Sequence, residues 1–137
     1  MKKFLLLFAV AVTFIGCSIG EDDNPKFHLE LLPVHSATFP AEFTLNQTYD
    51  IPIYFVRPST CHAFEGFYYL KEGNTRTIAV QTNVIENDQC VSAPTDPVMQ
   101  LLKIKITTSE EFIFKLWKGK SDSGEDVFEE VHVPVAP

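Results

Sequence analysis

The sequence predicts an all-β protein in which two sheets pack as a sandwich over residues 26–137. Three observations support this fold class. Apolar residues alternate with polar residues over short runs, as they do in strands with one buried face. Gly, Pro, Asn and Asp recur between these runs, where turns are expected, and no long segment has the apolar spacing of an amphipathic helix. Short strands separated by regular turn signals are typical of a β-sandwich.

The first half of this region contains predicted strands at residues 26–34, around Phe43 and Leu45, and at 48–57, 64–71 and 75–86. In the strand at 48–57, the residues on the predicted core face are Tyr49, Ile51, Ile53 and Phe55. Pro52 has no N–H to donate to a ladder, so we expect this strand at a sheet edge or with a bulge. Gly73 and Asn74 can adopt the positive φ of a tight turn, so the strands on either side of them are expected to form a hairpin.

The second half contains predicted strands at residues 98–108, 111–118 and 127–135. Their inward residues are expected to be Leu102, Ile104, Ile106, Phe112, Phe114, Leu116, Val131, Val133 and Val135. The polar segment 120–126 is expected to be a hairpin loop, and Pro134 places the last strand at an edge. A total of about seven strands with two blunted edges fits an antiparallel immunoglobulin-like sandwich. The only tryptophan, Trp117, comes late in the chain, so this resemblance is to the architecture and not to antibody-type domains.

Residues 1–16 have the organisation of a secretory signal peptide. Lys2 and Lys3 are followed by an apolar run from Phe4 to Ile15, broken only by Thr13. The run is shorter than the ~20 apolar residues that a membrane-spanning helix needs. A positive start followed by a short apolar region is typical of a signal that is removed after export.

The sequence Phe14-Ile15-Gly16-Cys17 resembles a lipobox, although Phe14 departs from the usual aliphatic residue. The resemblance implies that a diacylglycerol is attached to the Cys17 sulfur and that cleavage follows Gly16. One acyl chain binds a membrane only marginally, so a stable anchor needs several. The alternative is an ordinary signal peptide with an incidental cysteine. The acidic segment 17–25 is expected to be a flexible linker, and it also resembles the export signal of Bacteroidota surface lipoproteins.

Charge restricts the partners of the mature chain. The formal net charge is -7, and removal of Lys2 and Lys3 with the signal lowers it to -9. Such a chain is a poor binder of nucleic acid, because phosphate contacts need Lys and Arg. The acidic chain is not attracted to anionic lipid headgroups either, so the lipid anchor itself must hold it to its membrane partner.

With Cys17 assigned to the lipid, Cys61 and Cys90 are a pair in an oxidising compartment, which predicts a disulfide. Folding the hairpin about Gly73 brings Cys61 to the region near Asn87, a few residues before Cys90. The alternative is a metal-binding or nucleophilic pair, but the close Cys-x-x-Cys spacing that favours such sites is missing.

The run Arg57-Pro58-Ser59-Thr60-Cys61-His62, then Phe64-x-Gly66-Phe67-Tyr68-Tyr69 and Arg76-Thr77-Ile78-Ala79-Val80, resembles a pattern of small uncharacterised Bacteroidota lipoproteins of the flavobacterial type. The likeness covers most of the mature domain. It implies the sandwich fold and an outer-membrane location, facing the cell surface or alternatively the periplasm. It implies no activity and no active-site residues.

No residue pattern predicts catalysis, a metal site or a cofactor, so we expect that the protein is not an enzyme. Cys61 and His62 are adjacent in a strand, so their side chains would diverge, whereas a nucleophile and its base must be within hydrogen-bonding reach. Asp122, Glu125 and Asp126 share one loop and could attract calcium, but their spacing does not match a calcium loop and a solvated turn is the simpler interpretation.

Aromatic residues are the best candidates for a binding site. Tyr54, Tyr68 and Trp117 do not fit on the predicted inner face, and together they would form a platform for a sugar ring or a partner protein. The alternative is that they cover a sheet against a loop or are exposed singly.

These features favour a membrane-anchored, non-catalytic binding or accessory domain whose partner is a glycan or an envelope protein. Two alternatives remain open. The domain could be a structural spacer or assembly subunit of the envelope, or a hydrolase with an unrecognised site, which would need polar groups converging in a cleft.

Overall fold

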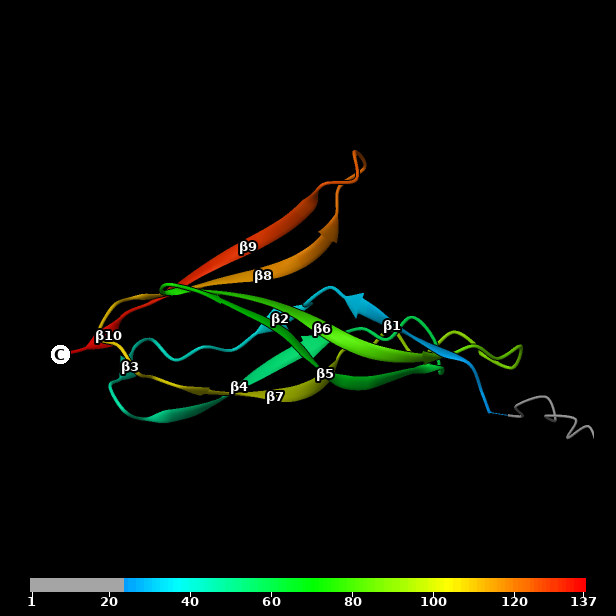
Figure 1. Ribbon diagram of the computed structural model, residues 1–137, viewed down its shortest axis with the longest axis horizontal. Helices are drawn as coiled ribbons and strands as arrows, with labels where there is room; N and C mark the ends of the chain where they lie inside the picture. Colours follow the sequence, from blue (N-terminus) through cyan, green and yellow to red (C-terminus); the bar gives the residue numbers. More distant parts are fainter. Residues whose placement is uncertain (1–23) are drawn as a thin grey trace, which may run out of the picture.

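A computed structural model describes residues 24–137, and over this range the chain is all β, with ten strands and no helix (Figure 1). The predicted signal peptide at 1–16, Cys17 and the linker up to residue 23 lie outside the described residues. In the described part, no helix is long and apolar enough to cross a membrane.

The larger sheet has five strands, with β6 (Thr75–Ile85) at its centre. One side of β6 pairs antiparallel with β5 (His62–Glu72). Its other side pairs first in parallel with β8 (Phe112–Lys120) and then antiparallel with β1 (Phe27–Leu32). The outer strand beyond β8 is β9 (Asp126–Val133).

The smaller sheet has three strands in the order β2 (Ser36–Ala37), β4 (Thr48–Phe55) and β7 (Val98–Lys105). A separate parallel pair joins β3 (Phe43–Thr44) to β10 (Val135–Ala136). Figure 1 shows β8 and β9 along the top of the molecule and β4 and β7 along the bottom, so the two sheets form the two layers of a sandwich.

The core lies between the layers and follows the predicted alternation. One cluster of buried residues takes Ile51, Ile53 and Phe55 from β4, Leu102 and Ile104 from β7, Phe112, Phe114 and Leu116 from β8, and Ile78 and Val80 from β6. Phenyl rings dominate its centre, where Phe114 stacks on Phe39 at 4.4 Å between centroids and meets Phe43 edge-on at 6.0 Å. Burial of such rings supplies most of the driving force for folding.

One detail of the predicted architecture, the purely antiparallel pairing, is wrong. The larger sheet is mixed, because β1 stops pairing with β6 at Leu32 and β8 pairs with the remaining part of β6 in the parallel direction. The smaller sheet is antiparallel. Three of the ten strands have only two residues, so seven strands have six residues or more. The all-β sandwich is confirmed, whereas its immunoglobulin-like connectivity stays a prediction.

Pro52 lies in a strand that is weakly paired on one side, and Pro134 directly follows the end of another strand. The predicted edge or bulge at Pro52 is wrong, because β4 is the middle strand of its sheet and pairs with β7 without a register shift, although β2 covers only two of its residues. Thr38 N–H donates to Pro52 O at 3.0 Å, so the backbone O and N of Pro52 both face the β2 side of the strand. The missing N–H of Pro52 therefore removes no hydrogen bond between β4 and β7. Pro134 ends the edge strand β9, and Val135 then begins the separate strand β10 instead of extending β9.

The predicted hairpin and disulfide are both present. Gly73 has φ of 61° at the tip between β5 and β6, a conformation that glycine adopts without steric cost. At the open end of this hairpin, Cys61 and Cys90 are joined by a disulfide with their Cα atoms 5.6 Å apart. The bond attaches the loop after β6 to the start of β5.

Candidate functional site

A groove crosses the outer face of the larger sheet because the central strand carries small residues there and its neighbours carry large ones. Tyr68 of β5 pairs with Ala79 of β6, and on the other side Trp117 of β8 pairs with Phe128 of β9. Ala79 is only 2% exposed and forms the floor, since its small side chain leaves the space between the aromatic walls open.

We call this feature the aromatic groove. It has a volume of about 600 Å³ and is lined by Leu31, Tyr68, Leu70, Glu72, Thr77, Ala79, Lys115, Trp117, Lys120, Asp126 and Phe128. This volume lies within the ~300–1,000 Å³ typical of ligand sites. The lining comes from five strands but its floor is the single strand β6, so the groove suits an extended ligand lying across the sheet face.

Trp117 is held in a fixed orientation. Its Nε1–H donates to Asp126 Oδ1 at 3.0 Å, and Lys120 Nζ donates to the same oxygen at 2.9 Å. The hydrogen bonds from Lys120 and Trp117 hold the pKa of the Asp126 carboxyl below its ordinary value of 3.8. The carboxylate therefore stays ionised at neutral pH and keeps the indole ring ready for a ligand without reorganisation.

The groove also carries polar groups. Lys115 Nζ lies 4.5 Å from the centroid of the Phe128 ring, a cation–π contact that places its ammonium group at the wall. Glu72 lies in the lining near the tip of the β5–β6 hairpin. Within the described range neither Glu72 nor Lys115 forms a salt bridge. Apolar walls with a few polar groups are the usual composition of a small-ligand site.

The structure brings together two of the three predicted platform residues. Tyr68 and Trp117 both line the aromatic groove. Tyr54 does not join them, because β4 belongs to the smaller sheet and Tyr54 faces out on the other side of the sandwich, paired with Met99. Phe128 completes the wall instead. Phe128 was not among the predicted platform residues, because only its pairing with Trp117 in the folded sheet reveals its place.

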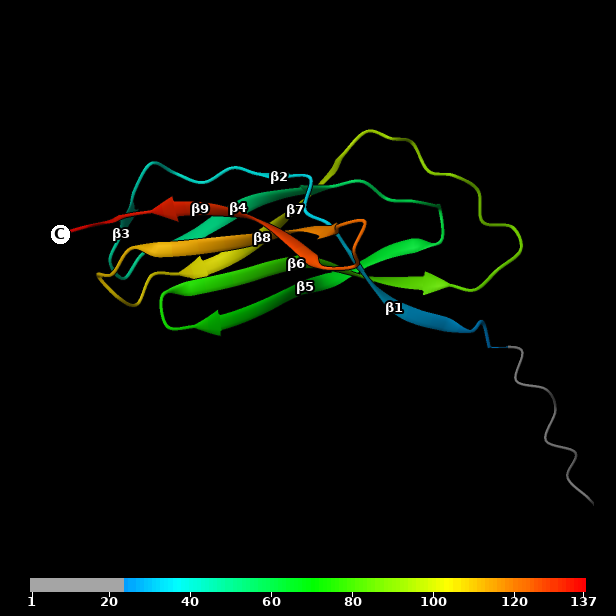
Figure 2. The same ribbon diagram turned by 90° about the horizontal axis from the view of Figure 1, so that it is seen from above.

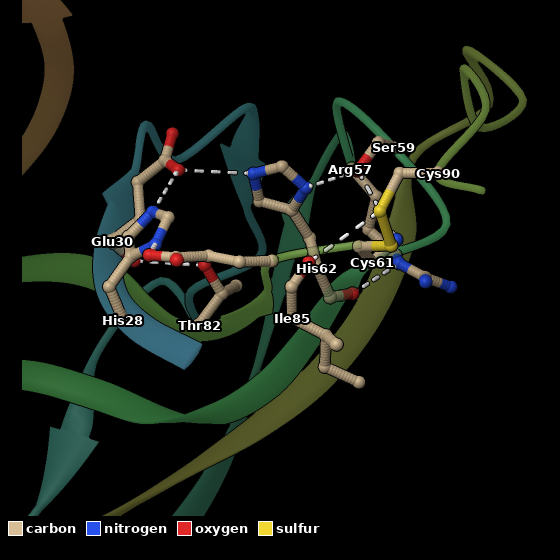
Figure 3. A network of polar contacts seen from close by, with 10 residues as sticks. His28, Glu30, Arg57, Ser59, Cys61, His62, Thr82, Ile85 and Cys90 are labelled. Carbon is tan, nitrogen blue, oxygen red and sulfur yellow. Dashed lines mark hydrogen bonds and ion pairs between the residues drawn. A yellow bond between two sulfur atoms is a disulfide. The ribbon is translucent and has the colours of Figure 1, made fainter. Parts of the chain in front are cut away.

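A second cluster, which the sequence analysis also missed, surrounds the buried side chain of His62 (Figure 3). Its Nε2 lies 3.2 Å from Glu30 Oε2, and its Nδ1 lies 2.8 Å from Ser59 Oγ. If Nε2 carries the proton, Nδ1 is left to accept from the serine hydroxyl, as in the hydroxyl–imidazole–carboxylate arrangement of acyl-transfer enzymes.

Acyl transfer also needs hydrogen-bond donors aimed at the oxyanion, and the backbone after Ser59 does not offer them. The next three N–H groups are already engaged. Thr60 N–H donates to Val91 O at 2.9 Å, Cys61 N–H to Ser59 Oγ at 3.2 Å and His62 N–H to Ser59 O at 3.3 Å. The cluster is therefore better explained as a hydrogen-bonded support that ties β1 to the start of β5.

The remaining candidates from the sequence do not gather into a site. Cys61 is in the disulfide, so it is not a free nucleophile beside His62. Asp126 is bonded to Trp117 and Lys120, and the loop before it closes on itself through a hydrogen bond from Ser121 N–H to Glu125 O at 2.8 Å. Within residues 24–137, no three His, Cys, Asp or Glu side chains are grouped so that they could hold a metal ion.

Comparison of the chain with protein-family models, with curated proteins and with solved structures finds no match.

Proposed function

We propose that the protein is an exported lipoprotein whose β-sandwich domain binds a saccharide chain in the aromatic groove and catalyses no reaction on it. The observation that carries this proposal is the groove, in which Tyr68 and Trp117 stand on either side of the small residue Ala79. A fixed aromatic wall on a rigid sheet is pre-organised for binding, which lowers the entropy lost when a ligand docks.

The chemistry of the lining favours a saccharide. A pyranose ring has apolar C–H faces, which pack on aromatic rings, and hydroxyl edges, which need hydrogen-bonding partners. Trp117 and Phe128 supply apolar surface on one wall, and Tyr68 supplies it on the other. The Thr77 hydroxyl and the Glu72 carboxylate lie in the same lining and can exchange hydrogen bonds with sugar hydroxyls.

The location is part of the proposal. The signal peptide pattern and the lipobox resemblance around Cys17 support attachment of the mature chain to the outer membrane through lipid. The mass of the mature N-terminus tests the lipid, and protease shaving of intact cells tests the side. Removal of the domain from intact cells would mean that it faces outward and meets extracellular glycans, whereas protection until the outer membrane is opened would place it in the periplasm.

Binding is tested with the full mature protein on a panel of bacterial and environmental glycans, followed by calorimetry of the best ligand. Trp117→Ala removes one wall, and Ala79→Leu fills the floor while its added carbons point away from the core. We expect each change to weaken binding at least tenfold, which corresponds to ~1.4 kcal/mol. Tyr54→Ala is the matched control, because it removes an outward-facing aromatic residue from the other sheet.

Equal affinities for the wild type, Trp117→Ala and Ala79→Leu would refute the groove as the site. Failure of every saccharide to bind, with capture of an envelope protein that Ala79→Leu abolishes, would keep the groove and replace the ligand by a protein.

A further inference from the structure

We propose that the outer surface at the start of β1, formed by Phe27, Leu29 and Ile85, rests in the headgroup region of the bilayer that holds the lipid on Cys17. We call these three residues the β1 patch. The inference rests on the lipid anchoring proposed above, and it adds a second, direct contact between the folded domain and the membrane.

Within residues 24–137, the β1 patch is a continuous apolar surface that stays exposed to solvent. Phe27 is 65% exposed, Leu29 61% and Ile85 39%. Phe27 pairs directly with Ile85 across β1 and β6, and Leu29 follows on the same face two residues further along β1. Adjacent exposed apolar side chains of this size mark a surface that contacts another apolar phase.

The position of the β1 patch relative to the anchor restricts what can cover it. Phe27 follows Cys17 by ten positions, so the connecting backbone can extend over at most ~35 Å. Figure 2 shows β1 at the end of the molecule opposite the C-terminus, which is the end where the described chain begins. When Cys17 is lipidated, the β1 patch is therefore the apolar surface of the domain with the shortest tether to the bilayer.

Charge favours a lipid surface over a second copy of the chain. The mature protein has a formal charge of -9, so two copies repel each other. The same net negative charge disfavours anionic lipids, so the surface that suits the patch is one of zwitterionic headgroups, with which Phe27 and Leu29 make apolar contact.

The test uses the lipidated mature protein in phosphatidylcholine vesicles, with Phe27→Trp and, as a second probe, Leu29→Trp. Leu101→Trp is the matched control, because Leu101 is similarly exposed on the outer face of the smaller sheet. Emission is measured as the increase over the native protein, which contains Trp117. We expect phosphatidylcholine brominated near the headgroup to quench the emission added at positions 27 and 29 and to leave the emission added at position 101 unchanged.

The outcomes separate the two proposals. If the protein floats with the vesicles but positions 27 and 29 are not quenched, the anchor stands and the membrane contact is refuted. Loss of quenching when the vesicle surface is made anionic would support a contact that the net negative charge of the domain restricts to zwitterionic lipid. If the tryptophan at position 27 becomes shielded from solvent only when the protein dimerises, the β1 patch contacts a second copy of the chain and the inference is overturned. A chain that does not float would refute both the anchor and the contact.

Discussion

Removal of the disulfide should destabilise the domain by acting on its unfolded state. Cys61 and Cys90 are 29 residues apart in the sequence. In the chain-entropy description, closing a loop of this length removes ~12 cal/mol/K from the unfolded chain, which is ~3.6 kcal/mol at room temperature. The double variant Cys61→Ser/Cys90→Ser is therefore expected to lose ~3–4 kcal/mol of unfolding free energy and to unfold at a urea concentration lower by at least ~1 M.

The loss should come from the unfolded state because other bonds keep the native loop in place. Arg57 Nε donates to His62 O at 2.7 Å, and its guanidinium also donates to Thr60 O at 3.1 Å. Ile85 N–H donates to Cys61 O at 3.0 Å. Urea unfolding followed by circular dichroism tests this reasoning, with a steeper urea dependence expected for the double variant because its unfolded chain is more expanded. A loss below ~1 kcal/mol would refute the loop-entropy argument.

Two further predictions concern single side chains. Phe114→Ala removes a fully buried ring that packs on three other phenyl rings, so it should cost ~3–5 kcal/mol in urea unfolding, while Val127→Ala on the exposed β9 should stay within ~0.5 kcal/mol of the wild type. Equal stability of the two variants would contradict the assigned core. Hydrogen bonds from Lys120 and Trp117 lower the pKa of Asp126 in the folded protein. Its ionised carboxylate therefore stabilises the fold at pH values above the unfolded pKa near 3.8, and this contribution is lost as the pH falls through the lower folded pKa. Trp117 fluorescence should therefore titrate with a midpoint below 3.8 and lose this transition in Asp126→Asn, whereas a midpoint at or above 3.8 would contradict the pairing.

The sequence predicted well what depends on neighbours along the chain. Alternation placed Ile51, Ile53 and Phe55 in the core, because a strand turns every second side chain to the same face. The turn at Gly73 followed from local turn chemistry, and the pairing of Cys61 with Cys90 followed from the cysteine count, with the hairpin bringing the two close. The alternation and the turn depend only on local geometry, so the order of residues along the chain is enough to predict them.

Features that depend on which strands become neighbours were not predictable in the same way. Tyr54 and Tyr68 both lie at outward positions of strands, and alternation cannot tell that β4 and β5 belong to different sheets. The exposed side chains of β1 illustrate the same limit. Phe27 and Leu29 alternate like core residues, yet they face outward, because the larger sheet uses the other face of β1 for its contact with the interior.

The cluster around His62 shows how one central strand creates a site from distant residues. Glu30 and Phe64 both pair with Thr82, from opposite sides of β6, so β6 fixes the distance between β1 and β5. Thr82 Oγ1–H also donates to Glu30 O at 2.9 Å, which anchors the backbone that holds the carboxylate. His62 precedes Phe64 by two residues and points to the same side, so its ring meets a carboxylate 32 residues earlier in the chain. The aromatic groove on the opposite face arises in the same way, since Ala79 of β6 separates Tyr68 of β5 from the aromatic wall of β8 and β9. Both sites thus depend on β6 having partners on both sides, a pairing that only the folded chain defines.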